Sequence, residues 1–308
     1  MQTKEKIYIV GHKKPDLDAI ASAVGYEAFK HALGHMKYEA IRCDRVNELT
    51  KWVFKKYDVH LPRLVEDFCG MNLVLVDHTF VESRPNGWEK TNILEVIDHH
   101  DVKLEDIIPK SITIRPCGST CSLITEMFFK SKITVPKNIA YILLSAILDD
   151  SLGLKSPTTI KLDRDMVDWL NKICKIEDLW EYSKKLFKIK DIWHRLTPRR
   201  IIEEDLRYTE INGNWVSISQ VEHVNNEKLP EDELIEELKR INKEEKFSTR
   251  LVMLTNPLES SCTLLVVGKD IEKLERELNK EIINNRVYLE GIVSRKKQVL
   301  PLLERIYS

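Results

Sequence analysis

Histidines and aspartates, the side chains that bind divalent metal ions, gather in four short stretches of this chain. They are GHKKPDLDAIASA at 11–23, VDHT at 76–79, VIDHH at 96–100 and SAILDDSLGLKSPTT at 145–159. Any one of them alone fits an ordinary surface loop, such as one in which Asp18 caps the helix that follows. Burying so many carboxylates and imidazoles together without a cation would be costly, because unpaired charges do not stay ionised in a dry site. The four stretches together therefore predict a site for a pair of divalent cations.

Short apolar runs lead into three of these stretches and predict the strands that position them. The runs span 6–11, 72–77 and 92–98, are rich in Ile and Val, and end in polar residues, as buried parallel strands do. Helical patterns lie between and after them, at 18–33, 46–57, 119–131, 136–149 and 163–173. This alternation predicts an α/β fold with a doubly wound, mainly parallel sheet, whose ligands gather beyond the carboxyl ends of the strands.

The chain changes character after about residue 175 and predicts a second, smaller unit. A charged segment, read as a helix followed by a linker containing Pro198, leads to LRYTEINGNWVSISQV at 206–221. Its Asn-Gly pair predicts a hairpin turn between two strands. A helix at 230–244, strands at 249–255 and 262–268, and a helix at 270–280 complete a predicted α+β unit. We predict domains at 1–188 and 199–308, joined by a linker at 189–198.

Composition argues against several classes of partner. The 308 residues include 48 Lys and Arg against 49 Asp and Glu, so no basic field predicts nucleic acid as a partner. No apolar stretch approaches the roughly 20 residues that cross a bilayer, and the opening MQTKEKIYIVGH has too short an apolar segment for a secretory signal. Six scattered cysteines suit a reducing compartment, and we read Cys117 and Cys121 as structural. We expect a cytoplasmic protein with no nucleic-acid or membrane partner.

The four stretches resemble the DHH phosphoesterase superfamily, and GIVSRKKQVLP at 291–301 resembles the signature of the DHHA2 domain. Together they are similar to the manganese-dependent, family II inorganic pyrophosphatases. The resemblance implies an inorganic diphosphatase that splits pyrophosphate into two phosphates with a hydroxide shared by two Mn²⁺ or Co²⁺ ions. It also implies an additional Mg²⁺ that arrives with the substrate, and a homodimer formed through the N-terminal domain. RecJ-like nucleases of the superfamily carry a GGGH-type motif that this sequence lacks.

Matching the family pattern position by position implies roles for ten residues. The first metal would be bound by His12 and Asp16, the second by Asp18, His99 and Asp150, and both by a bridging Asp77. The catalytic and substrate-binding residues would be His100, Arg295, Lys296 and Arg207. His100 would reach the substrate or the leaving group, while Arg295 and Lys296 would clamp pyrophosphate from the second domain. Arg207 stands where the family has a substrate-binding lysine.

Several positions depart from the family pattern and leave alternatives open. The chain has Lys14 and Leu17 where the pattern has Asn and Thr, and Thr79 and Phe80 where it has Asn and Glu. Arginine at 207 is planar and bidentate, unlike lysine. An exopolyphosphatase-like enzyme, or another small phosphoanhydride hydrolase of the superfamily, is therefore the main alternative. A non-catalytic metal- or nucleotide-binding regulator is another, and Asp149 is an alternative ligand to Asp150.

Overall fold

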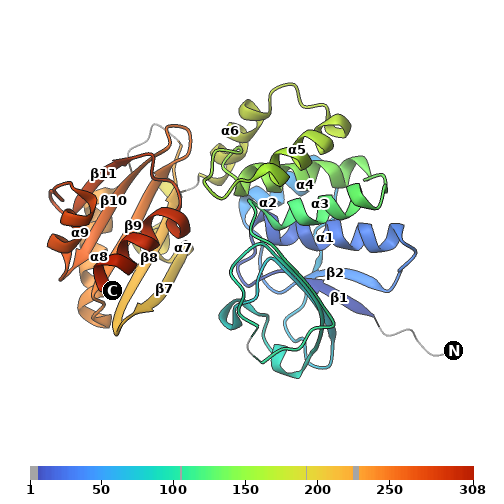
Figure 1. Ribbon diagram of the computed structural model, residues 1–308, viewed down its shortest axis with the longest axis horizontal. Helices are drawn as coiled ribbons and strands as arrows, with labels where there is room; N and C mark the ends of the chain where they lie inside the picture. The colour runs from blue at the N-terminus through green and yellow to red at the C-terminus, as the bar shows by residue number, and fades with distance from the viewer. Residues whose placement is uncertain (1–5, 105, 192, 225–228) are drawn as a thin grey trace. The chain divides into compact units, whose positions relative to one another are not determined.

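The computed structural model describes residues 6–104, 106–191, 193–224 and 229–308. It forms two units, residues 1–186 and 187–308, each with its own sheet and core (Figure 1). The division falls inside helix α6 (Leu179–Lys190). The predicted linker at 189–198 holds the end of this helix, a 3₁₀ turn at Trp193–Arg195 (η3) and the first residue of α7 (Pro198–Glu204). That this segment acts as a linker stays a prediction.

The first unit is built on a six-stranded sheet in which every neighbouring pair of strands is parallel. The strand order is β3-β2-β1-β4-β5-β6. The strands are β1 (Ile7–Val10), β2 (Tyr38–Arg42), β3 (Arg63–Leu64), β4 (Asn72–Val76), β5 (Asn92–Asp98) and β6 (Ser111–Ile114). The predicted α/β class is confirmed, and the three predicted strands lie side by side as β1, β4 and β5. Strands β2, β3 and β6 were not predicted, because they are short and mix polar with apolar residues.

Helices cover one face of this sheet and irregular segments cover the other. The helices of the unit are α1 (Leu17–Ala32), α2 (Glu48–Lys56), α3 (Thr120–Lys130), α4 (Lys137–Asp150), α5 (Lys161–Cys174) and α6. Figure 1 shows α1, α3, α4 and α5 gathered on one side of the strands. On the other side, Phe68 and Trp88 from the connecting segments pack against Leu73 and Leu75 of β4. These segments include two 3₁₀ turns, η1 (Val81–Ser83) and η2 (Trp88–Lys90).

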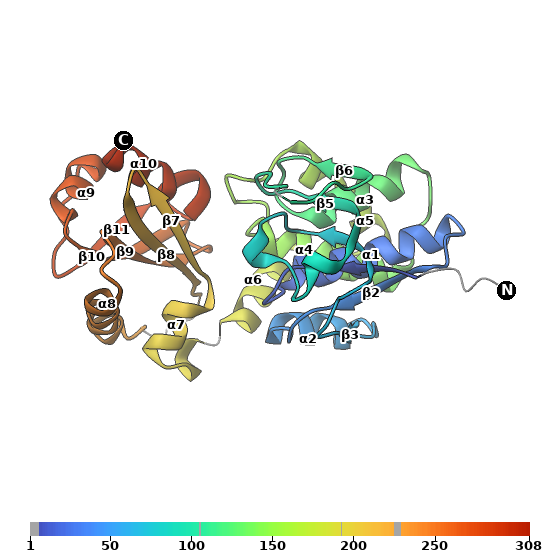
Figure 2. The ribbon, with the colours of Figure 1, turned by 90° about the horizontal axis from the view of Figure 1, so that it is seen from below.

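The second unit is a five-stranded mixed sheet between two layers of helices (Figure 2). Its strand order is β11-β10-β9-β8-β7, and only β8 and β9 pair in parallel among the described strands. The strands are β7 (Leu206–Ile211), β8 (Asn214–Glu222), β9 (Thr249–Asn256), β10 (Ser261–Gly268) and β11 (Arg286–Glu290). One core packs α7 and α8 (Glu231–Glu245) on the sheet, and the other packs α9 (Ile271–Leu278) and α10 (Leu300–Tyr307).

The predicted hairpin is confirmed, because β7 and β8 pair in antiparallel fashion around Asn212 and Gly213. Both turn residues have positive φ, 47° and 78°, as a type I′ turn requires. Strand β11 and helix α10 were not predicted. Within the described part of the chain, no helix combines the length and the apolar character needed to cross a membrane.

Candidate metal centre

Three adjacent strands bring the predicted ligands to one edge of the first sheet. His12 follows β1, Asp77 follows β4 and His99 follows β5, and β4 lies between the other two strands. Asp77 has a φ of 66°, in the left-handed region that aspartate adopts more readily than most residues. The chain therefore turns directly after β4, at the carboxyl edge where the sequence predicted the site.

His12, Asp16 and Asp77 form a first group whose candidate ligand atoms all lie within 4.8 Å of one another. The Nε2 atom of His12 is 3.8 Å from Oδ1 of Asp16 and 3.6 Å from Oδ2 of Asp77. Its Nδ1 lies 2.7 Å from the carbonyl oxygen of Lys13 and donates to it, which leaves Nε2 for a ligand. Burial lowers the pKa of His12, but Asp16 and Asp77 together raise it more. The two carboxylates therefore favour a positive charge at this position.

A second group with the same spacing consists of Asp18, His99 and Asp150. The Nε2 atom of His99 is 3.5 Å from Oδ2 of Asp150 and 3.4 Å from Oδ1 of Asp77. Its Nδ1 donates to the carbonyl oxygen of Cys117 at 2.9 Å, so this ring too is fixed with Nε2 toward the carboxylates. Asp77 thus presents Oδ2 to His12 of the first group and Oδ1 to His99 of the second, as the predicted bridging role requires.

Asp18 belongs to α1, but its carboxylate lies at the N-terminus of α3. The alternative in which Asp18 caps the helix that follows its loop is wrong. Asp16 caps α1 by accepting from the main-chain nitrogen of Ala19 at 2.9 Å, while Asp18 is only 3% exposed. The Asp18 carboxylate accepts hydrogen bonds from Ser119 Oγ at 2.6 Å and from the main-chain nitrogens of Thr120 and Cys121, at 2.7 and 3.0 Å. The positive end of the helix dipole stabilises a carboxylate placed there.

Ser119 and Thr120 support the ligands but were not predicted as site residues. Thr120 Oγ1 donates to Oδ1 of Asp77 at 2.9 Å, and Ser119 is the N-cap of α3. A serine that opens a helical pattern is a recognisable capping signal. Its target, a carboxylate about a hundred residues earlier, is not readable from that signal.

Negative charge is crowded in this site, which fits divalent cations. Burial, followed by the charge of Asp18, raises the pKa of Asp77 and that of Asp150 well above their usual values. Oδ2 of Asp150 is buried and has no hydrogen-bond partner among the described residues. A cation in each group would balance these charges and give this oxygen a partner. Two imidazoles with four carboxylates suit a metal of intermediate hardness such as Mn²⁺.

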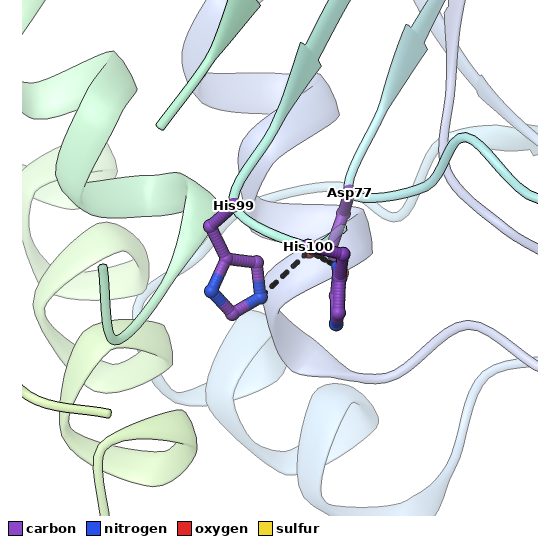
Figure 3. A group of neighbouring side chains, drawn as sticks. All are labelled: Asp77, His99 and His100. Carbon is purple, nitrogen blue, oxygen red and sulfur yellow. Dashed lines mark ion pairs between the residues drawn. The ribbon is translucent and has the colours of Figure 1, made fainter. Parts of the chain in front are cut away.

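His100 is held beside the two groups by Asp98, a residue of the VIDHH stretch that was not predicted to have a role. Nδ1 of His100 lies 2.8 Å from Oδ1 of the fully buried Asp98, and 3.8 Å from Oδ1 of Asp77. Figure 3 shows His99 and His100 converging on Asp77. Burial lowers the pKa of His100, but the hydrogen bond to Asp98 and the charges of Asp77 and Asp98 together raise it above its usual value. The side chain of His100 is 40% exposed, so a substrate can reach it.

The structure favours Asp150 over Asp149 as the ligand at the end of α4. Asp150 belongs to the second group, whereas Asp149 belongs to none of the three candidate groups in the described residues. The third group is Asp77, His99 and His100. Asp149 is 5% exposed, and its charge contributes to raising the pKa of Asp150.

In the second unit, Asp205 connects two of the predicted substrate-binding residues. The guanidinium of Arg295 donates to the main-chain oxygen of Asp205 at 2.7 Å and pairs with its carboxylate at 3.1 and 3.2 Å. Nε of Arg207 lies 3.8 Å from the same carboxylate. Arg295 and Lys296 both belong to a π-helical turn at Arg295–Val299 (η4), which follows β11. Asp205 was not predicted as a site residue.

Comparisons with known proteins cover nearly the whole chain. Residues 6–147 match the model of the DHH family, N-terminal domain, and residues 184–306 match that of the DHHA2 domain. The manganese-dependent inorganic pyrophosphatase of Methanocaldococcus jannaschii is 34% identical over 98% of this chain and 99% of its own length. A protein of Archaeoglobus fulgidus, named a probable manganese-dependent inorganic pyrophosphatase, is 34% identical over 98% of each chain.

Solved structures agree with these relatives. A crystal structure from Methanococcus jannaschii, assigned to the family II inorganic pyrophosphatases, has a TM-score of 0.83 and 33% identity, and covers 98% of this chain and 99% of that one. An exopolyphosphatase-related protein of Bacteroides fragilis reaches a TM-score of 0.51 at 14% identity, over 98% of this chain and 92% of that one, a likeness that shows the fold alone. The chain therefore belongs to the family of manganese-dependent inorganic pyrophosphatases, in which a DHH domain is followed by a DHHA2 domain.

Proposed function

We propose that this protein is an inorganic diphosphatase that hydrolyses pyrophosphate to two phosphates at a pair of Mn²⁺ ions. The observation that carries the proposal is the position of Asp77, whose two oxygens face two separate groups of candidate ligands. Relatives named manganese-dependent inorganic pyrophosphatases match the chain over nearly its full length and support the same reaction.

Six residues would hold the two ions. His12 and Asp16 would bind the first, Asp18, His99 and Asp150 the second, and Asp77 both. Co²⁺ fits the same mixture of nitrogen and oxygen donors, and an additional Mg²⁺ would enter with the substrate. When bound, two such ions supply charge to the phosphoryl oxygens and lower the pKa of a water molecule that attacks phosphorus.

His100 would donate a proton to the leaving phosphate. Its Nδ1 is held by Asp98, which leaves Nε2 as the ring nitrogen for the substrate. In the charged form, which Asp98 favours, Nε2 donates a proton to the oxygen that leaves as the bond from phosphorus to the bridging oxygen breaks. The products are two phosphates, one carrying the oxygen of water and the other the former bridging oxygen.

The positively charged side chains of the second unit would bind the phosphate groups of the substrate. Arg295, Lys296 and Arg207 offer charged donors, and such donors form the stronger hydrogen bonds to phosphate oxygens. The link from Arg295 and Arg207 to Asp205 would hold both guanidinium groups in a defined orientation before the substrate arrives. The segment at 189–198 would be the linker that lets this unit close over the substrate.

We also propose that the protein is cytoplasmic and forms a homodimer through the first unit. The homodimer rests on the family resemblance, and the cytoplasmic location on the scattered cysteines.

A phosphate-release assay on a panel of substrates tests the function. We expect kcat/KM of the Mn²⁺-loaded protein to be at least about ten times higher for pyrophosphate than for tripolyphosphate, because a small binding site favours the smaller anion. A preference for tripolyphosphate would instead identify an exopolyphosphatase-like enzyme. Release from neither anion, by a protein that binds Mn²⁺, would identify a non-catalytic regulator.

Substituting Arg207 tests the predicted grip at the position that departs from the family pattern. Its side chain is 60% exposed, so the fold should tolerate Arg207→Ala. We expect this variant to lose about tenfold or more in kcat/KM with unchanged metal content, because a charge-assisted phosphate contact is removed. Arg207→Lys should shift the preference further toward pyrophosphate, because a point charge replaces a bidentate fork.

Arg305→Ala is the matched control, since Arg305 lies in the same unit and is 56% exposed. It should leave kcat/KM for both anions unchanged. If both Arg207 variants matched wild type on both substrates, Arg207 would be an ordinary strand residue. The grip would then consist of Arg295 and Lys296.

A further inference from the structure

A charged side chain, that of Arg84, is completely buried next to the candidate metal centre. It is 0% exposed, and its guanidinium carbon lies 4.3 Å from the centre of the Trp88 ring. Nε and one terminal nitrogen donate to the main-chain oxygen of Thr79, at 3.2 and 2.9 Å. The same terminal nitrogen also donates to the main-chain oxygen of Lys103 at 3.3 Å. None of the roles proposed above involves this residue.

The two residues that Arg84 connects belong to different loops of the site. Thr79 lies two residues after Asp77, and Lys103 lies three residues after His100. The side chain of Thr79 strengthens the link, since its Oγ1 donates to the main-chain oxygen of Asp101 at 3.0 Å and accepts from the main-chain nitrogen of Lys103 at 3.1 Å. Arg84 therefore lies where the loops after β4 and β5 meet.

The loop that carries the first ligand joins the same junction. The main-chain nitrogen of Lys13, next to His12, donates to the oxygen of Ser83 at 2.9 Å. Ser83 ends the 3₁₀ turn that directly precedes Arg84. The loops that follow β1 and β5 are thus hydrogen-bonded to one short segment of the loop after β4, residues 79–84, whose conformation the buried guanidinium holds.

We propose that Arg84 is a positioning residue for the metal centre, which locks together the three loops that carry His12, Asp77 and the His99–His100 pair. The inference rests on the proposed function, because it concerns the metals that the first unit would hold. Arg84 would touch neither metal nor substrate, and would act by fixing the distance between Asp77 and the histidines on either side of it.

Arginine suits this position for a physical reason. Burying a guanidinium is costly, so its donors must be satisfied by acceptors placed around it. A rigid planar fork can donate to carbonyl oxygens of two loops at once, whereas a lysine ammonium is a single point on a flexible stem. The held segment also contains Thr79 and Phe80, where the sequence departs from the family pattern. The junction is therefore held in part by Thr79, a residue that the pattern does not contain.

Mn²⁺ binding to metal-stripped protein tests the proposal without relying on turnover. Free Mn²⁺ measured by electron paramagnetic resonance during titration gives the Kd of each variant. We expect Arg84→Lys to raise the Kd by about tenfold, as the loss of outer partners of metal ligands commonly does. Thr79→Val, which keeps the shape but removes Oγ1, should raise it by a smaller factor. Near-UV circular dichroism of the metal-free protein shows whether each variant is folded.

Arg250→Lys is the matched control, because Arg250 is also 0% exposed but belongs to β9 of the second unit. It should lower the unfolding temperature and leave the Mn²⁺ Kd unchanged. A folded Arg84→Lys protein with the wild-type Kd would overturn the inference. If Arg84→Lys did not fold, a wild-type Kd for Thr79→Val would overturn it in the same way. Failure of the wild-type protein to bind Mn²⁺ would overturn the proposed function, and this inference with it.

Discussion

Hydrolysis of pyrophosphate is expected to stop when the metal ions are removed with a chelator, and to return with Mn²⁺ or Co²⁺ better than with Mg²⁺ alone. The loss should reach about a thousandfold, because two cations supply several kcal/mol of transition-state stabilisation and each 1.4 kcal/mol is worth about tenfold in rate. The preference follows from His12 and His99, whose ring nitrogens face the carboxylates of the site. Nitrogen donors suit Mn²⁺ and Co²⁺ better than Mg²⁺.

The experiment compares phosphate release by chelator-treated protein, by the same protein after each metal is added back, and by protein dialysed without chelator. Metal content is measured in every sample. The chelated protein should also unfold at a lower temperature, because ions that bind only the folded state stabilise it and Asp18, Asp77 and Asp150 lose their counter-charge. Full activity in protein shown to be metal-free would contradict the two-metal site.

Asp77→Asn is expected to be the most damaging single change in the chain. Asp77 is 2% exposed, and its two oxygens face His12 and His99 at 3.6 and 3.4 Å. A neutral amide has nearly the same shape, but it offers one acceptor oxygen and no charge to two cations. We expect turnover to fall by about a thousandfold and at least one equivalent of Mn²⁺ to be lost, because the missing charge should cost several kcal/mol.

Asp270→Asn is a matched control, because Asp270 lies in the second unit, its side chain is 13% exposed, and it accepts a hydrogen bond from Tyr307 Oη at 3.0 Å. It should lower stability while keeping the metal content and most of the turnover. Metal analysis, phosphate release and thermal unfolding are measured on both variants. Near-normal metal content and turnover in Asp77→Asn would assign the bridge to another residue.

Much of the first unit could be predicted because its signals are local. Strands β1, β4 and β5 are short apolar runs, and each is followed within two residues by the histidine or aspartate that it positions. Once these strands are taken as parallel, their carboxyl ends must lie at one edge. Strands β2, β3, β6 and β11 escaped prediction, because two to five residues of mixed polarity carry little periodic signal.

By itself, the sequence determined the types of the predicted metal ligands, their order and the edge of the sheet at which they lie. Only the tertiary structure decided how each ligand is oriented. Ser119 reaches Asp18 across 101 positions, and the two oxygens of Asp77 are divided between His12 and His99. Arg84 connects the loops that follow two different strands, β4 and β5. Such contacts join residues far apart in the chain, and their geometry depends on how helices and loops pack on the sheet, which no local pattern of residues encodes.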